Sequence, residues 1–173
     1  ETCTRTGDAA FTFVIKPEDV PINDSAWYAF DILGGAGERV DIKLAYIDGT
    51  HRYVPKSREQ GKGWQIADTR VAVTNAKKTA TFTVQPKTNA LRIAGQDIID
   101  TGDHKVWIDK MAALDFVNLS EIGSSIEGRP IYHLEEADAP GLNKPYVVVV
   151  GRQHPPETTG AESLMPFVET IWG

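Results

Sequence analysis

A series of short alternating runs in the first hundred residues constrains the fold more than any other feature of this sequence. Between Phe11 and about Asp100, β-branched and aromatic residues are frequent, and turn residues such as Gly34-Gly35 and Asp48-Gly49 separate the runs. Alternation with a period of two places successive side chains on opposite faces of a strand. We therefore predict an all-β sandwich with strands at residues 12–15, 27–32, 40–46, 71–73, 79–84 and 90–94.

The pattern changes after Thr101-Gly102-Asp103. We predict, in order, a helix over 109–119, a turn leading into a strand over 125–134, a central strand over 145–150 and a helix from Thr159 onward. The four valines at 147–150 are typical of a strand covered on both faces, as in a parallel or mixed sheet flanked by helices. The predicted organisation is thus a β-sandwich domain over 1–103, followed by an α/β mixed-sheet region over 104–173.

The last predicted helix carries a start signal and a conflicting residue. Thr158 or Thr159 is the expected N-cap, and Glu162 stands three residues after Thr159, as a capping box requires. Pro166 disfavours an uninterrupted helix because proline lacks the N–H that the helix ladder needs.

Charge and composition exclude several classes of function. The chain has 24 acidic against 18 basic residues and a formal charge of −6, which disfavours nucleic acid as a partner. No apolar run approaches the roughly 20 residues of a membrane-spanning helix. Cys3 is the only cysteine, so neither an intrachain disulfide nor a cysteine metal cluster can form. Because Glu1 stands where an initiator methionine would, we expect a trimmed leader and a periplasmic or secreted protein, with the cytoplasm as the alternative.

The loop Gly151–Glu157 holds the best candidates for chemistry. It lies between the predicted central strand and the last helix, and ligands of open α/β sheets bind at the carboxyl ends of strands. His154 and Glu157, at i and i+3, can turn an imidazole nitrogen and a carboxylate towards one point. Such a pair is part of the two-histidine, one-glutamate ligand set that catalytic zinc often uses. The spacing also arises by chance in solvated loops.

Arg152, beside this pair, could contact a substrate carboxylate, but a surface or structural role is the more common one for a loop arginine. The aromatic residues could line a binding groove, although in a small sandwich they are usually packing residues. These aromatic candidates are Trp27, Tyr28, Trp64 and Trp107.

The stretch from Glu121 to Thr158 resembles the opening of the zinc metallocarboxypeptidase catalytic domain. Gly123-Ser124-Ser125-Ile126-Glu127-Gly128-Arg129-Pro130-Ile131, a strand and then His154-x-x-Glu157 follow the order of that family's motifs. Pro155, directly after the histidine, resembles the cytosolic-carboxypeptidase-like branch, although Pro156 replaces that branch's usual glycine. The same branch has a β-sandwich domain before its catalytic domain.

The resemblance implies that His154 and Glu157 bind Zn²⁺ and that the enzyme removes residues from peptide or protein C-termini. A second histidine, a carboxylate-binding arginine and a general-base glutamate would follow further along the chain. After Glu157 sixteen residues remain, and none is histidine or arginine. We therefore expect an inactive fragment of a longer enzyme, with no catalytic residue of its own.

Two alternatives remain open. The β-sandwich could be a binding or docking module without catalytic activity, which an exposed aromatic patch on one sheet face would indicate. A zinc deacylase of the acylase type, acting on small N-acyl amino acids, also uses His-x-x-Glu, but Pro155 and the preceding β-sandwich disfavour it.

Overall fold

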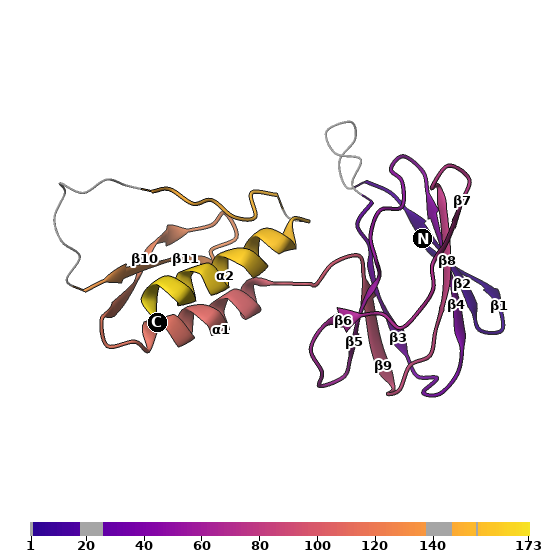
Figure 1. Ribbon diagram of the computed structural model, residues 1–173, viewed down its shortest axis with the longest axis horizontal. Helices are drawn as coiled ribbons and strands as arrows, with labels where there is room; N and C mark the ends of the chain where they lie inside the picture. The colour runs from indigo at the N-terminus through magenta and orange to yellow at the C-terminus, as the bar shows by residue number, and fades with distance from the viewer. Residues whose placement is uncertain (1, 18–25, 138–146, 155) are drawn as a thin grey trace. The chain divides into compact units, whose positions relative to one another are not determined.

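The computed structural model describes residues 2–17, 26–137, 147–154 and 156–173 (Figure 1). Its contacts divide the chain into two compact units, Glu1–Ile98 and Ile99–Gly173. Strands make up the first unit, whereas the second combines two helices with a hairpin. The chain is therefore mostly β-strand with few helices.

Two sheets make up the first unit. The larger sheet has the spatial order β1 (Cys3–Gly7), β2 (Ala10–Ile15), β4 (Val40–Tyr46), β8 (Thr79–Val84), β7 (Ala72–Thr74). The smaller sheet has the order β3 (Ala29–Leu33), β9 (Ala90–Ala94), β5 (Lys56–Glu59), β6 (Gln65–Ile66). Strands β2 and β4 are parallel, and the other paired strands are antiparallel.

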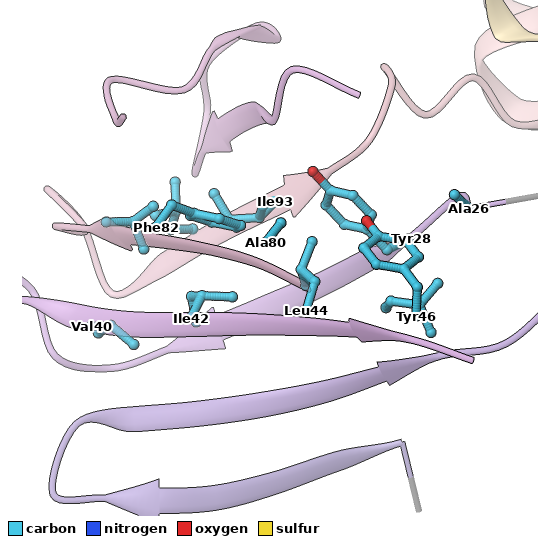
Figure 2. Packing of buried hydrophobic residues seen from close by; sticks show 12 residues of the cluster. Ala26, Tyr28, Val40, Ile42, Leu44, Tyr46, Ala80, Phe82 and Ile93 are labelled. Atoms are coloured by element: carbon cyan, nitrogen blue, oxygen red, sulfur yellow. The ribbon is translucent and has the colours of Figure 1, made fainter. Parts of the chain in front are cut away.

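Side chains of both sheets share one hydrophobic core (Figure 2). Leu44 from β4 and Ile93 from β9 are completely buried. Phe13 from the larger sheet stacks on Phe30 from the smaller one with ring centroids 4.0 Å apart. Burial alternates along β4, where Asp41 points outward between buried neighbours. The alternation in the sequence therefore becomes the inner and outer faces of the sheets.

The sequence predicts some strands to the residue and misses others. Segments 40–46, 79–84 and 90–94 are strands with the predicted bounds, while those predicted at 12–15, 27–32 and 71–73 are shifted by one or two residues at their ends. Strands β1, β5 and β6 were not predicted. Strand β5 reads Lys-Ser-Arg-Glu and contains no apolar residue, yet Ser57 and Glu59 point inward and are buried. Hydrophobic periodicity cannot reveal a strand of this composition.

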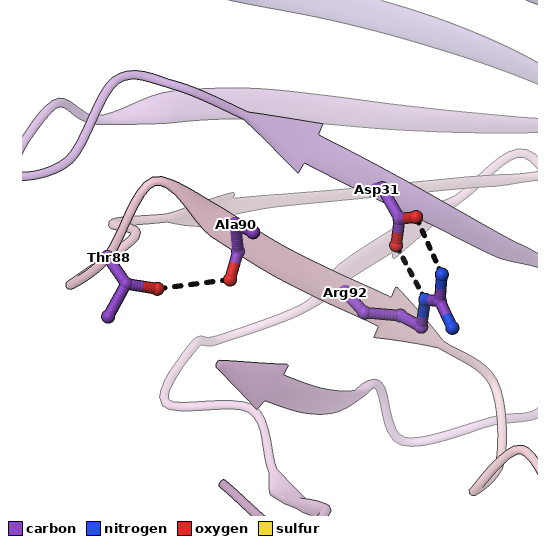
Figure 3. A network of polar contacts seen from close by, with 4 residues as sticks. All are labelled: Asp31, Thr88, Ala90 and Arg92. Atoms are coloured by element: carbon purple, nitrogen blue, oxygen red, sulfur yellow. Dashed lines mark hydrogen bonds and ion pairs between the residues drawn. The ribbon is translucent and has the colours of Figure 1, made fainter. Parts of the chain in front are cut away.

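One polar pair joins two strands on the outer surface of the smaller sheet. Nε and Nη2 of Arg92 on β9 donate to the two carboxylate oxygens of Asp31 on β3, at 2.6 and 2.7 Å (Figure 3). The hydrogen bond from Arg92 is the main reason that the pKa of Asp31 lies below its ordinary value. Because both side chains are exposed, we expect the pair to contribute little to the free energy of unfolding.

The second unit contains α1 (Thr101–Ala112), β10 (Val117–Ser124), β11 (Pro130–Glu136) and α2 (Thr158–Trp172). Strands β10 and β11 form an antiparallel hairpin. Gly128 closes its turn with a positive φ of 76° and donates its N–H to the carbonyl of Ser125. The predicted turn and strand over 125–134 are thereby confirmed. Neither described helix is long and apolar enough to cross a membrane.

The helix predicted over 109–119 is wrong in position. Helix α1 starts eight residues earlier, because Asp100 is its N-cap and accepts from the N–H groups of Gly102 and Asp103. Asp103 completes a capping box by accepting from the N–H of Asp100. Thr101-Gly102-Asp103, after which the hydrophobic pattern changes, forms the first turn of this helix. The helix ends at Ala112, and β10 begins at Val117.

The central strand predicted over 145–150 is not found where the structure describes that segment. Residues 147–150 form no strand, and their valine side chains are between 50% and 87% exposed. Pro145 and Tyr146 lie outside the described residues. A strand needs a hydrogen-bonded neighbour, and in the described part of the second unit β10 and β11 pair with each other. The valine composition alone therefore does not make a strand here.

The helix predicted from Thr159 is confirmed as α2, but its predicted cap is wrong. The N-cap is Glu157, and it makes no side-chain cap hydrogen bond. The first helical residue is Thr158, which is 2% exposed and directs its side chain inward. Pro166 was expected to disfavour an uninterrupted helix, but it lies inside α2.

Candidate metal centre

The segment from Gly151 to Glu157 leads directly into α2, and all of it except Pro155 is described. Two backbone hydrogen bonds shape its end. The N–H of Glu157 donates to the carbonyl of His154 at 3.0 Å, and the N–H of Gly160 donates to the carbonyl of Glu157 at 3.0 Å. Consecutive turns therefore carry the chain from His154 into the helix, and they place residues 154 and 157 on the same side of the loop.

The side chains of His154 and Glu157 face each other. Nδ1 of His154 lies 3.1 Å from Oε1 of Glu157, and the side chains are 67% and 56% exposed. The second carboxylate oxygen, Oε2, lies 3.4 Å from the backbone nitrogen of His154. The structure thus brings together the two residues that the sequence predicted to act jointly, with their donor atoms open to solvent.

The donor atoms of this pair suit a zinc ion. Zinc binds histidine nitrogen and carboxylate oxygen at about 2.0–2.1 Å in tetrahedral geometry, which separates two donors by about 3.3 Å. The observed separation of 3.1 Å is close to that value. Nitrogen and carboxylate oxygen are also the donor types that catalytic zinc sites combine. His154 and Glu157 can therefore supply two corners of a zinc site.

The described residues offer no third metal ligand beside His154 and Glu157. Among them, no group of three or more His, Cys, Asp or Glu side chains is arranged to hold a metal ion. His51 is buried in the first unit, where its Nδ1 lies 2.9 Å from the hydroxyl of Tyr46. His104 lies on α1, and His133 on β11 next to Ser120. His154 and Glu157 can therefore supply two metal ligands at most, and the described residues add no third side chain to them.

Arg152 takes part in the structure of the loop. Its Nη1 donates to the backbone carbonyl of Ile99 at 2.5 Å, and its own backbone has a positive φ of 49°. Burial lowers the pKa of His104 on α1, and the nearby positive charge of Arg152 lowers it further against the opposing effect of Asp100 and Asp103. These contacts join the loop to the residues that start α1.

Gly160 is a residue of the site that sequence reasoning missed. A Cβ atom on Gly160 would lie 2.5 Å from the backbone nitrogen of Arg152, so a larger residue would force the loop and the helix apart. A Cβ on Gly151 would similarly lie 3.0 Å from the carbonyl oxygen of Gly160. Glycine is a poor helix former, so its presence in the first turn of a predicted helix was the available signal of a close approach.

Comparisons with known proteins find similarity to zinc carboxypeptidases. A family model described as zinc carboxypeptidase matches residues 104–172. Carboxypeptidase E of Caenorhabditis elegans is 38% identical over 60 residues, which make up 33% of this chain and 13% of that protein. These matches support the resemblance to zinc metallocarboxypeptidases in the second unit.

Solved structures extend the likeness over more of the chain. A metallo-carboxypeptidase from Burkholderia cenocepacia is similar over 99% of this chain and 46% of its own, with a TM-score of 0.70 and 19% identity. The metallo-carboxypeptidase from Pseudomonas aeruginosa, solved in complex with (2-guanidinoethylmercapto)succinic acid, is similar over 76% of this chain and 36% of its own, with a TM-score of 0.55 and 16% identity. The fold is that of these metallocarboxypeptidase structures, and the chain spans less than half of their length.

Proposed function

We propose that this chain is part of a zinc-dependent carboxypeptidase and that His154 and Glu157 are two of its zinc ligands. The observation that carries the proposal is the 3.1 Å separation of Nδ1 of His154 and Oε1 of Glu157, which matches the spacing of two donors on one zinc ion. The match of the zinc carboxypeptidase family model to residues 104–172 supports the class of enzyme that we propose.

The finer proposal concerns the two units. The first unit, with two sheets around one core, is the β-sandwich that precedes the catalytic domain, and the second unit begins an α/β carboxypeptidase domain. Pro155, next to His154, supports membership of the cytosolic-carboxypeptidase-like branch. The substrate class is the C-terminus of a peptide or protein, and export from the cytoplasm remains a prediction.

Each proposed ligand has a defined task. His154 would bind through Nδ1 as a neutral imidazole, and Glu157 would bind as a carboxylate that also offsets part of the metal charge. A zinc ion held there would act as a Lewis acid on a substrate carbonyl and would lower the pKa of water to about 7. The general base and the substrate-binding arginine are not assigned to residues of this chain. We therefore expect residues 1–173 alone to bind zinc weakly and not to hydrolyse peptides.

A zinc titration followed by NMR tests the ligand assignment, because it detects weak binding at individual residues. We expect zinc to shift the ¹H–¹⁵N signals of His154, Glu157 and their neighbours, and His154→Ala to weaken binding at least about tenfold, because even replacing a residue that only supports a ligand weakens metal binding by about 10–100-fold. His133→Ala is the matched control and should bind zinc like the parent chain, because His133 lies on β11. Binding of parental strength in His154→Ala would refute the assignment.

The docking-module alternative lacks the feature expected of it. In the described part of the first unit, every aromatic side chain is buried or partly buried, so neither sheet presents an exposed aromatic patch. Tyr28, one of the aromatic candidates, is 4% exposed and belongs to the core. We therefore prefer the carboxypeptidase proposal to a binding module, and Pro155 continues to disfavour an acylase-type deacylase.

A further inference from the structure

The exposed side chains of His154 and Glu157 are not held in place by packing. They are 67% and 56% exposed, and they contact each other through Nδ1 of His154 and Oε1 of Glu157. Their orientation must therefore come largely from the backbone that carries them. A metal site that binds well needs ligands held in place before the metal arrives.

The helix side of the loop is fixed by a close approach. The backbone nitrogen of Arg152 lies where a side chain on Gly160 would begin, at 2.5 Å from the position of its Cβ. Gly160 also donates its N–H to the carbonyl of Glu157 at 3.0 Å. The first turn of α2 is thus in contact with the loop both before His154 and at Glu157.

The opposite side of the loop is tied to α1 through Arg152. Its guanidinium donates to the carbonyl of Ile99, the residue directly before the N-cap Asp100. Arg152 also lies close enough to His104, in the first turns of α1, for its charge to lower the pKa of that histidine. The loop therefore has a second anchor at the start of the other helix.

The two helices that provide these anchors are joined to each other. Nε1 of Trp107 on α1 donates to Oε1 of Glu169 on α2 at 2.9 Å, and Nζ of Lys110 lies 2.8 Å from the same oxygen. The anchors at Ile99 and Gly160 thus lie at the starts of two helices that are joined to each other. A loop held at both sides by that pair has less freedom than its exposure suggests.

We propose that Arg152 is a positioning residue of the metal site: its guanidinium, bound to the carbonyl of Ile99, holds the loop against Gly160 so that His154 and Glu157 face one point. Its role in metal binding rests on the proposed function. This assigns Arg152 to the support of the ligands rather than to contact with a substrate carboxylate. Residues that support metal ligands in this way typically change metal affinity by about 10–100-fold when they are replaced.

Amide hydrogen exchange of the metal-free chain tests the anchor independently of zinc. In Arg152→Ala we expect exchange at the N–H groups of Glu157 and Gly160 to become about tenfold faster or more, because their hydrogen bonds belong to the loosened loop. The interior of α1, measured at Met111, should keep its protection. Loss of protection throughout both helices would show a general structural role and would overturn the proposal.

The zinc titration then measures the consequence for the metal. Arg152→Ala should weaken zinc binding about tenfold, and Arg152→Lys, which keeps a positive charge and a donor, should restore part of the loss. Arg129→Ala is the matched control, because Arg129 lies in the hairpin turn and pairs with Glu127. It should change neither exchange at the loop nor zinc affinity.

Gly160→Ala tests the same contact from the helix. Alanine is the better helix former, so helix propensity alone would make the first turn of α2 more stable. We expect instead faster exchange at the Glu157 N–H and weaker zinc binding, because the new Cβ displaces the loop.

The outcomes separate this inference from the proposed function. If His154→Ala abolishes zinc binding while Arg152→Ala leaves both exchange and affinity within about twofold of the parent, the positioning role is refuted and the ligand assignment stands. If His154→Ala leaves zinc binding unchanged, the ligand assignment fails. The exchange measurement then still decides whether Arg152 orders the loop.

Discussion

Replacing Leu44 by alanine is expected to lower the free energy of unfolding of the strand-rich unit by about 2–5 kcal/mol. Leu44 is completely buried at the centre of the core between the two sheets (Figure 2). The substitution removes apolar contacts and leaves a cavity that the two rigid sheets cannot easily close. Thermal or urea unfolding of the chain, followed by a spectroscopic signal of the first unit, measures the loss.

Leu33→Ala is the matched control for that experiment. Leu33 lies on β3 of the same unit but is 78% exposed, so its replacement should change the free energy of unfolding by no more than about 0.5 kcal/mol. Equal losses in Leu33→Ala and Leu44→Ala would contradict the assignment of the core.

Replacing Glu59 by alanine should lower the free energy of unfolding of the first unit by about 2–4 kcal/mol, because a buried charged acceptor of several hydrogen bonds is lost. Oε1 of Glu59 accepts from the N–H of Lys87 at 2.8 Å, and Oε2 accepts from the N–H and the hydroxyl of Thr88 at 3.1 and 2.5 Å. The Thr88 hydroxyl also lies 3.0 Å from the carbonyl of Ala90 (Figure 3). Denaturant unfolding at pH 7 measures this effect.

The contribution of Glu59 should depend on pH in a defined direction. Burial raises the pKa of its carboxyl, but the hydrogen bonds from Thr88 and Lys87 and the charge of Lys87 outweigh burial and hold the pKa below the ordinary 4.5. A group with a lowered pKa in the folded state stabilises the fold above its unfolded pKa. That stability is lost as the pH falls through the folded pKa.

A comparison of variants isolates this pH effect. The stability difference between the parent chain and Glu59→Gln should be largest near neutral pH and should shrink on acidification below about pH 4.5. Glu38→Gln, which changes an exposed glutamate of the same unit, should show a much smaller difference. A difference for Glu59→Gln that grows on acidification would contradict the hydrogen-bonded, charged state of Glu59.

The first unit is the more predictable part of the fold, because the alternation of apolar and polar residues in its core strands indicates strands. In β4 and β8, alternate residues are buried in a shared core, and their sequences show a matching alternation with a period of two. Strand β5 gives no such signal. Its inward residues are Ser57 and Glu59, and Glu59 accepts hydrogen bonds from Lys87 and Thr88, which are distant in sequence.

The second unit shows how local signals compete with pairing. Asp100 and Asp103 cap α1 through hydrogen bonds between residues that are close in sequence, yet the predicted helix starts eight residues too late. At 147–150 the prediction is wrong in the opposite sense, because a strand is predicted and none forms. The valine composition favours a strand, but a strand also needs a neighbouring strand to pair with. Propensity is a weak guide wherever the decisive partner is not adjacent in sequence.

The sequence predicted that the two candidate ligands face each other, but it did not predict the contacts that support their loop. The spacing of His154 and Glu157 indicated that they could face one point, and the structure places them 3.1 Å apart. The sequence could not show that Arg152 reaches the carbonyl of Ile99, because that contact joins residues 53 positions apart. Ligand types can be recognised from local motifs, whereas the groups that hold them are set by tertiary structure.

An anomalous difference map at the zinc absorption edge, from crystals of the chain grown with zinc, tests the ligand assignment most directly. The proposal predicts a peak about 2.0–2.2 Å from both Nδ1 of His154 and a carboxylate oxygen of Glu157. Crystals of His154→Ala grown in the same way should lack it. A zinc peak at other residues with none between His154 and Glu157, or the same peak in His154→Ala, would contradict the proposal that this loop begins the zinc site of a carboxypeptidase.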